Sequence, residues 1–248
     1  MEFQVTYYSA RIYVPAHSAF REKQQMPSGL LFPVKNTFLL HFINPRCSIV
    51  SMKQLILDTE TTSLYPGNIC QLSYIIAADG EGAEGKNYYF DVDTMDWRAQ
   101  NVHGLSVQML RALSGGNTFS HYIKEITSDL KHADIIIGHN ILFDIRFLRH
   151  EFMGCGTLFP GKKMFCTMKY FTDIIKIPKS GGRYKYPNLG ELARYLGIGD
   201  SDVAKACETL FGGRDLRPHD ARFDTAAVKL CLDEAEKRGL LPGMLLSR

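Results

Sequence analysis

From Met52 onward the sequence predicts an α/β domain in which helices flank one mixed β-sheet. Short runs of apolar and β-branched residues, separated by turn signals, predict three strands joined by tight connections. A fourth run, at 135–138, leads directly into a helical pattern. Strands joined by short turns pair antiparallel, whereas strand–helix units produce parallel pairs. The sheet is therefore expected to have an antiparallel meander on one side and parallel strands on the other.

The expected elements follow one another in a simple order. The strands are expected at 54–58, 70–78, 86–92 and 135–138. The turn signals between the first three are Pro66-Gly67-Asn68 and Asp79-Gly80. The helices are expected at 106–113, 120–131, 143–152, 189–196, 203–211 and 222–238.

The first 51 residues differ from the rest of the chain. No helical period is sustained there, and the prolines at 15, 27, 33 and 45 interrupt every candidate element. The pattern changes at Met52, directly before the first expected strand, which suggests an alternative translation start. We predict a poorly ordered N-terminal extension at 1–51 and one domain at 52–248. The extension is interpreted as a translated leader, and the alternative is a targeting or partner-binding arm.

Composition narrows the class of protein. A hydrophobic fraction of 45% is enough to form a sizeable core. The six cysteines include no C-x-x-C pair, which argues against a zinc site and against a disulfide scaffold. The start of the chain lacks a signal-peptide pattern, and the apolar run at 37–43 is too short to span a membrane. We therefore expect a soluble, cytoplasmic protein with reduced thiols and no membrane partner.

Two acids end the first expected strand, in the segment LDTETTSL at 57–64. Because side chains alternate along a strand, Asp58 and Glu60 project from the same face, about 6 to 7 Å apart along the chain. Two such charges repel by about 4 kcal/mol at a separation of roughly 4 Å and an effective dielectric constant near 20. A divalent cation reverses this repulsion, so the pattern favours an oxygen-ligand metal site. The alternative is that both carboxylates are solvated at a strand end.

A third acid, Asp144, lies in the segment GHNILFD at 138–144, which follows a strand and opens a helix. The helix dipole favours an anion in the first turn, so Asp144 has a purely structural alternative role. Asn140 has one as well, because asparagine is a common helix cap. Phe147 is interpreted as part of a core stripe.

A fourth acid, Asp224, lies early in the last expected helix, in the segment HDARFD at 219–224. His219 stands five residues before it, on the approach to the helix. A lone histidine is usually structural or exposed. Because the pKa of histidine lies near neutrality, a histidine beside a carboxylate is also a candidate general base.

Together these segments resemble the DEDDh subgroup of the DnaQ-like 3′–5′ exonuclease family. The D-x-E pair, the acid of GHNILFD and the H-x-x-x-x-D of HDARFD occur in the family's order, and NVHGL at 101–105 resembles its His-Gly segment. The resemblance covers roughly residues 53–238. It implies a ribonuclease H-like fold, with 52–248 as an exonuclease domain. The other subgroup has a tyrosine where this chain has Asp220, which indicates the histidine version.

The resemblance implies a catalytic set and a mechanism. Two divalent cations, Mg²⁺ with Mn²⁺ as a substitute, would be held by Asp58, Glu60, Asp144 and Asp224. His219 would take the proton from the attacking water. Two-metal hydrolysis of the terminal phosphodiester bond would release nucleoside 5′-monophosphates.

The resemblance also implies contacts with the terminal nucleotide. The residues placed around it are Thr59, Thr61, Leu64, His103, Asn140 and Phe143. Leu64 and Phe143 are expected to press on bases, while His103 and Asn140 offer polar contacts. For Leu64 the alternative is a surface turn residue.

The segment at 161–186 is strongly basic, with seven lysines and arginines against one acid. Five aromatic residues are interleaved with these charges, a composition typical of a groove that tracks phosphates and stacks bases. We expect a substrate-binding loop in which Lys179, Arg183 and Lys185 contact nucleic acid and 180–182 forms a mobile tip. The alternative is a solvated loop whose aromatics pack inward. Because 52–248 carries 24 charges of each sign, only this local excess is informative.

The leading interpretation is an exonuclease acting on single-stranded 3′ ends, with DNA favoured over RNA, similar to the proofreading epsilon subunit of DNA polymerase III. Only 24 residues follow Asp224, so no long tethering tail is visible, and a free-standing DNA repair nuclease is favoured over a stable DNA replication subunit. Association with a polymerase and the oligomeric state are left open. The alternatives are an RNA-trimming exoribonuclease and a catalytically inactive nucleic-acid-binding module. Retention of all five catalytic positions argues against inactivity.

Overall fold

The computed structural model describes residues 52–65, 67–78, 82–212, 216–243 and 245. The predicted extension at 1–51 and the turn at Asp79-Gly80 lie outside these residues. No helix in the described part of the chain has both the length and the apolar character needed to span a bilayer.

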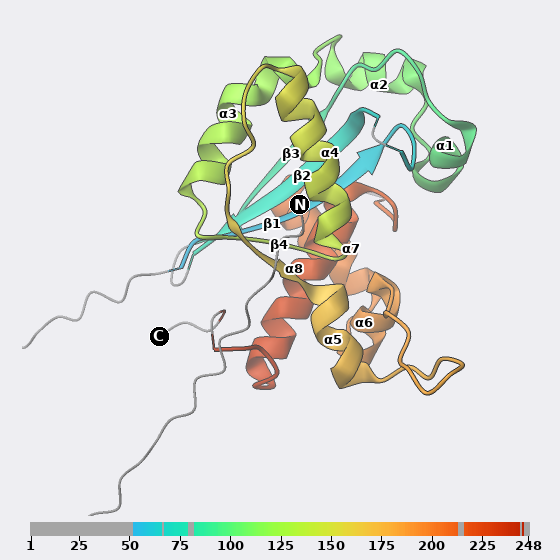
Figure 1. Ribbon diagram of the computed structural model, residues 1–248, viewed down its shortest axis with the longest axis vertical. Helices are drawn as coiled ribbons and strands as arrows, with labels where there is room; N and C mark the ends of the chain where they lie inside the picture. The colour runs from blue at the N-terminus through green and yellow to red at the C-terminus, as the bar shows by residue number, and fades with distance from the viewer. Residues whose placement is uncertain (1–51, 66, 79–81, 213–215, 244, 246–248) are drawn as a thin grey trace, which may run out of the picture. The chain divides into compact units, whose positions relative to one another are not determined.

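The described chain forms a five-stranded mixed sheet with the spatial order β3-β2-β1-β4-β5 (Figure 1). The strands are β1 (Gln54–Thr61), β2 (Ile69–Ala77), β3 (Glu84–Tyr89), β4 (Ile135–Gly138) and β5 (Lys163–Cys166). β1 pairs antiparallel with β2, and β2 pairs antiparallel with β3. β4 pairs parallel with β1 and with β5. The predicted fold class, a meander joined to parallel strands, is confirmed.

Helices cover both faces of this sheet. They are α1 (Trp97–His103), α2 (Val107–Ser114), α3 (Phe119–His132), α4 (Ile141–Gly154), α5 (Thr167–Ile175), α6 (Leu189–Tyr195), α7 (Asp200–Phe211) and α8 (Ala221–Lys237). One core cluster joins the sheet to α3 and α4, and a second joins it to α5, α6 and α8. Figure 1 shows α3 and α4 on one side of the strands and α8 on the other.

Three elements were not predicted from sequence. α1 is only seven residues long and buries a single side chain, so it lacks an amphipathic stripe; it begins at the cap Asp96 and ends at Gly104, which has a φ of 80°. The other two, β5 and α5, lie in the basic segment that was interpreted as a long loop. Phe165 and Phe171 of that segment are buried in the core between the sheet and α6, which explains why it folds.

The alternation of side chains along β1 divides its residues between the two faces of the sheet. Leu55 and Leu57 belong to the core beneath α3 and α4, whereas Ile56 belongs to the core beneath α8. A strand has a side-chain period of two, so Asp58 faces α8 and Thr59 faces α4. The end of β1 therefore presents polar side chains to both helical layers.

Candidate active site

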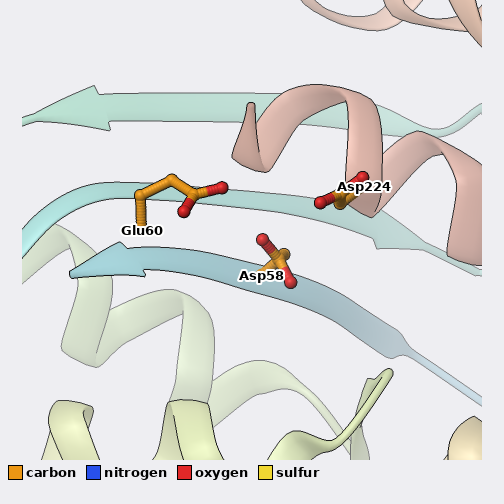
Figure 2. Close-up of side chains that lie close together, drawn as sticks. All are labelled: Asp58, Glu60 and Asp224. Carbon is orange, nitrogen blue, oxygen red and sulfur yellow. The ribbon is translucent and has the colours of Figure 1, made fainter. Parts of the chain in front are cut away.

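Three carboxylates meet at the end of β1. One oxygen from each of Asp58, Glu60 and Asp224 lies within 4.8 Å of the other two. Figure 2 shows Asp58 and Glu60 on β1 and Asp224 on α8, with the carboxylates of Asp58 and Asp224 turned toward one another. Glu60 is buried, and the other two are half-buried. The structure thus brings together two acids from one strand and a third that is 166 positions away from Asp58 in the sequence.

The start of α8 is fastened to the sheet, and this fixes where Asp224 lies. Asp220 caps the helix by accepting a hydrogen bond from the backbone N–H of Arg222, at 3.0 Å. Its carboxylate also accepts two bonds from the Arg222 guanidinium, at 2.9 and 2.7 Å. Gln71, fully buried on β2, donates to Asp220 at 3.0 Å and accepts from the backbone N–H of Ala221 at 3.3 Å. Burial opposes ionisation of Asp220, but the bonds from Arg222 and Gln71 outweigh it and lower its pKa.

Asp144 lies on α4 at the position that Asp224 has on α8. Each acid is four residues after the residue that caps its helix, Asn140 in α4 and Asp220 in α8. Asp144 is buried and is not one of the three clustered acids. Its Oδ1 accepts hydrogen bonds from the backbone N–H of Thr59 at 3.1 Å and from the Thr59 hydroxyl at 2.8 Å. Asn140 has a φ of 68° and makes no side-chain cap, so its amide is not used in the way that the capping alternative requires.

Electrostatics at this site strongly disfavour four bare carboxylates. Burial, followed by the charges of Asp144 and Asp224, raises the pKa of Asp58 well above its ordinary value. Burial and the Asp224 charge raise the pKa of Glu60 to about 9. Burial also raises the pKa of Asp144 to about 7, against the opposing bonds from Thr59. Asp224 is raised less, to about 6, because burial is offset by His219.

No lysine or arginine within the described ranges forms an ion pair with any of these four acids. Glu208 of α7 is not one of the four. Within the described residues, therefore, no paired lysine or arginine compensates these acids. Buried like charges of this kind are costly unless a cation compensates them. Carboxylate oxygens are the ligands that Mg²⁺ and Mn²⁺ prefer, so the chemistry of the donor set fits a divalent metal.

Two histidines lie beside the acids. His219 is exposed, adopts a φ of 67° and donates its backbone N–H to Asp224 at 3.2 Å. His103, at the end of α1, is buried, and its Nδ1 accepts a hydrogen bond from the N–H of Leu105 at 3.0 Å. That bond requires the tautomer with a proton on Nε2, which makes no hydrogen bond of good geometry within the described residues, although the nearby Thr61 backbone partly offsets the effect of burial on the pKa of the ring. Burial lowers the pKa of His103, which keeps the ring neutral.

The residues predicted to touch the terminal nucleotide divide into buried and exposed groups. Thr59 and Thr61 are buried, and the Thr61 hydroxyl donates to the carbonyl of Ser63 at 2.9 Å. Leu64 is 72% exposed, in agreement with a surface turn residue, and Phe143 is half-buried. Sequence reasoning missed Arg146, which donates to the Leu64 carbonyl at 3.2 Å and lies 5.4 Å from the Phe143 ring centroid.

The basic segment is only partly a loop. After α5 it forms a short hairpin, in which Lys179 N–H donates to the Arg183 carbonyl at 3.0 Å and Lys185 N–H donates to the Ile177 carbonyl at 2.9 Å. Lys179 and Arg183 are exposed, whereas Lys185 is half-buried and pairs with Glu191 at 2.6 Å. The predicted tip at 180–182 is the turn of this hairpin, with positive φ at both glycines.

Comparison with known proteins identifies the family. The family model described as exonuclease, RNase_T, matches residues 55–203. The chain belongs to this family. The predicted DnaQ-like 3′–5′ exonuclease resemblance is thereby confirmed, and the buried acidic cluster of this family member fits divalent metal use. The match ends before His219 and Asp224, so their proximity to β1 is known from the geometry.

Relatives with curated names agree with this assignment. DNA polymerase III subunit epsilon of Rickettsia prowazekii is 31% identical over 220 residues, which cover 77% of this chain and 90% of the relative. The subunit epsilon of Rickettsia felis is 30% identical over 154 residues, covering 53% and 66%. That of Rickettsia conorii is 34% identical over 106 residues, covering 41% and 44%. The aligned parts of the last two relatives thus fall short of two thirds of their length.

Solved structures of exonuclease I share the fold. One is 18% identical, has a TM-score of 0.56, and is matched over 75% of this chain and 41% of its own length. Another, of E. coli exonuclease I in complex with a 5cy-dA13 oligonucleotide, is 17% identical with a TM-score of 0.57, over 75% and 40% of the two chains. At these identities the likeness confirms the ribonuclease H-like architecture alone.

Proposed function

We propose that this protein hydrolyses the terminal phosphodiester bond at single-stranded 3′ ends of nucleic acid and releases nucleoside 5′-monophosphates. The observation that carries the proposal is the convergence of Asp58, Glu60 and Asp224 within 4.8 Å, with no lysine or arginine of the described residues paired to them, in a member of an exonuclease family. A divalent cation bound by these oxygens would compensate their mutual repulsion and bring positive charge to a phosphate.

Asp58, Glu60 and Asp224 would hold one Mg²⁺, and Asp144 would complete the shell of a second that shares Asp58; Mn²⁺ would substitute. When bound, the pair supplies an activated water and positive charge beside the leaving 3′-oxygen. Thr59 keeps Asp144 oriented through two hydrogen bonds. The Arg222 and Gln71 contacts of Asp220 keep Asp224 at the end of β1.

His219 would take the proton of the attacking water. Three features support this role: it is exposed, it precedes Asp224 on the approach to α8, and its side chain forms no hydrogen bond or ion pair with any residue that the structure describes. His103 offers the complementary chemistry. Its Nε2–H makes no hydrogen bond of good geometry with the described residues, so it is a donor that a phosphate or the 3′-hydroxyl of the substrate would satisfy.

Three further residues would form the pocket for the terminal nucleotide. Exposed Leu64 and half-buried Phe143 would contact bases, and the exposed Asn140 would contact the sugar or phosphate. Arg146 joins the Leu64 turn to Phe143, so the two apolar contacts are held by one side chain. Thr59 and Thr61 would contribute through the backbone, because their hydroxyls are already bonded.

DNA is the favoured substrate, because the curated relatives are DNA polymerase subunits and the similar exonuclease I structure holds a DNA oligonucleotide. The same relatives motivate a search for a polymerase partner. RNA is the second candidate, because the matching family model carries the name RNase_T.

A direct assay tests the proposal. Matched DNA and RNA oligonucleotides with a 5′ label are incubated with the purified protein in Mg²⁺ or in EDTA, and a circular single strand serves as a substrate without ends. We expect a ladder of shortening products from the 3′ end, free mononucleotides, no cleavage of the circle, and no reaction in EDTA or with Asp58→Asn. Internal cleavage, or shortening that persists in EDTA, would show that the proposal is wrong.

A further inference from the structure

A basic and aromatic hollow lies apart from the acidic cluster. It has a volume of about 960 Å³ and is formed by α5 and the hairpin that follows it. Its cationic lining residues are Lys169, Lys179, Arg183 and Lys185, and its aromatic ones are Tyr184 and Tyr186. The four acids of the active site, which are Asp58, Glu60, Asp144 and Asp224, are not among the residues that line it.

The charges in this hollow are largely available to a ligand. Lys169, Lys179 and Arg183 are exposed and form no ion pair with any residue that the structure describes. Only Lys185 is paired, with Glu191. The one acid in the lining is Asp173. Three free cations beside one acid therefore produce a locally positive surface in a domain with balanced charge.

The two tyrosines complete the chemistry. Tyr184 is 44% exposed and Tyr186 is 58% exposed, whereas Phe165 and Phe171 of the same segment are buried. Of the five aromatics of the segment, Phe165, Tyr170 and Phe171 pack in or against the core, and Tyr184 and Tyr186 line the hollow. Exposed aromatic rings beside unpaired cations suit a single strand, because each base can stack on a ring while its phosphate meets a cation.

A short hydrogen-bonded segment connects the hollow to the active site. Tyr186 lines the hollow, and Asn188 lines a second hollow of about 260 Å³ that also includes His219 and Asp224. Between them, the Pro187 carbonyl accepts a hydrogen bond from Nε2 of His139 at 3.0 Å. Nδ1 of the same ring lies 3.0 Å from the hydroxyl of Thr167, the first residue of α5. His139 immediately follows β4, so the hairpin is tied to the end of the strand that leads into α4 and Asp144.

We infer that this hollow binds the nucleic-acid strand upstream of the terminal nucleotide, so that the enzyme prefers strands of several nucleotides to dinucleotides. The inference rests on the proposed exonuclease activity and adds a second contact region to it. The ligand is a single-stranded phosphodiester chain, from DNA or RNA. The active site acts on the 3′ end while the hairpin and α5 hold the preceding backbone.

The test compares long and minimal substrates. The minimal substrate is the p-nitrophenyl ester of thymidine 5′-monophosphate, which is too small to contact the hollow while it occupies the active site. The long substrates are DNA and RNA strands of about a dozen nucleotides, a length comparable to the site sizes of single-strand-binding proteins. The variants are Lys179→Gln with Arg183→Gln, and Tyr184→Ala with Tyr186→Ala. Lys124→Gln with Lys205→Gln, exposed on α3 and α7, is the matched control for lost charge.

We expect each hairpin variant to raise the KM for long strands by about tenfold or more, with kcat unchanged. The Lys179→Gln, Arg183→Gln variant lacks two positive side chains, so the slope of log KM against log salt concentration should fall by about 1.4, which is about 0.7 for each lost phosphate contact. Hydrolysis of the p-nitrophenyl ester should be unaffected, and the control should behave as the wild type.

The outcomes separate the two proposals. If the wild type hydrolyses neither the ester nor the strands, the proposed function fails. If it hydrolyses both and the hairpin variants retain the wild-type KM and salt dependence on DNA and RNA, the upstream site is refuted while the exonuclease stands. A loss on one type of strand alone supports the site and identifies its ligand.

Discussion

Thr59 holds the carboxylate of Asp144 through both its backbone N–H and its hydroxyl, at 3.1 and 2.8 Å from the same oxygen. The contact exists because Thr59 faces α4, while its neighbours Asp58 and Glu60 face α8 and Asp224. One strand thereby organises acids from both helical layers. Five predictions follow from this arrangement and its surroundings.

Replacing Thr59 by Val should remove the hydroxyl bond to Asp144 while leaving the backbone bond and the side-chain volume. Partners of metal ligands contribute about 10- to 100-fold to metal affinity, so the Mg²⁺ concentration for half-maximal activity should rise within that range. A titration of initial rate against Mg²⁺ measures the effect. Thr59→Ser, which keeps the hydroxyl, should resemble the wild type. An unchanged Mg²⁺ requirement in the Val variant would show that the hydroxyl does not position Asp144.

Asp58→Asn should abolish turnover and yet stabilise the fold in metal-free buffer. Asp58 lies among like charges, so a neutral amide of the same shape relieves repulsion, by on the order of 1–3 kcal/mol in the free energy of unfolding. Thermal melts in EDTA near pH 8 measure this. The exposed Asp173→Asn should change stability by less than about 0.5 kcal/mol. A lower melting temperature for Asp58→Asn would mean that the carboxylate has a stabilising partner.

Mg²⁺ should stabilise the protein more at high pH than at low pH. The folded-state pKa values of Asp58, Glu60, Asp144 and Asp224 are all raised, the last three to about 9, 7 and 6. Protonation therefore favours the folded state, and the metal-free protein loses this stability as pH rises from about 4 to about 9. A bound cation replaces the protons. The increase in melting temperature on adding Mg²⁺ should thus be larger near pH 8 than near pH 6, and an equal increase would contradict the linkage.

His219 should be replaced in two ways, because its φ of 67° is unfavourable for most side chains. Asn tolerates this conformation and lacks a base, whereas Ala removes the ring and adds strain. Both variants should lose on the order of 100-fold in kcat between about pH 6 and 8, the usual contribution of a general base. His219→Asn should keep the wild-type melting temperature. Full activity of the Asn variant across this pH range would exclude His219 as the proton acceptor.

Gly138→Ala should destabilise the junction of β4 and α4. A Cβ at this position would lie 2.8 Å from Cδ1 of Ile141 and 3.0 Å from the carbonyl oxygen of Leu57, directly before Asp58. Relief requires the Ile141 side chain to shift and the Leu57 carbonyl to give way by a few tenths of an ångström, which in this buried place costs about 1–3 kcal/mol. Chemical denaturation measures the loss, which should be accompanied by weaker Mg²⁺ activation. Gly154→Ala, with open space at its Cβ, is the control and should not be destabilising.

The local features of this protein were accessible from its sequence. The period of two along β1 was enough to predict that Asp58 and Glu60 share a face. Asp144 and Asp224 were predicted to lie early in their helices, and the structure places each of them four residues after the residue at the helix cap, Asn140 or Asp220. β5 and α5 were missed because their lysines suggested a solvated loop, although Phe165 and Phe171 anchor them in the core.

Only the tertiary structure decided which distant groups meet. Gln71 of β2 donates a hydrogen bond to Asp220, the carboxylate of Asp224 lies beside Asp58, and the hydroxyl of Thr59 is bound to Asp144. Side-chain alternation and helix capping arise from backbone geometry within a few residues, so they leave a pattern in the sequence. Contacts between segments 80 or more residues apart depend on how sheet and helices pack, and no local pattern records that packing.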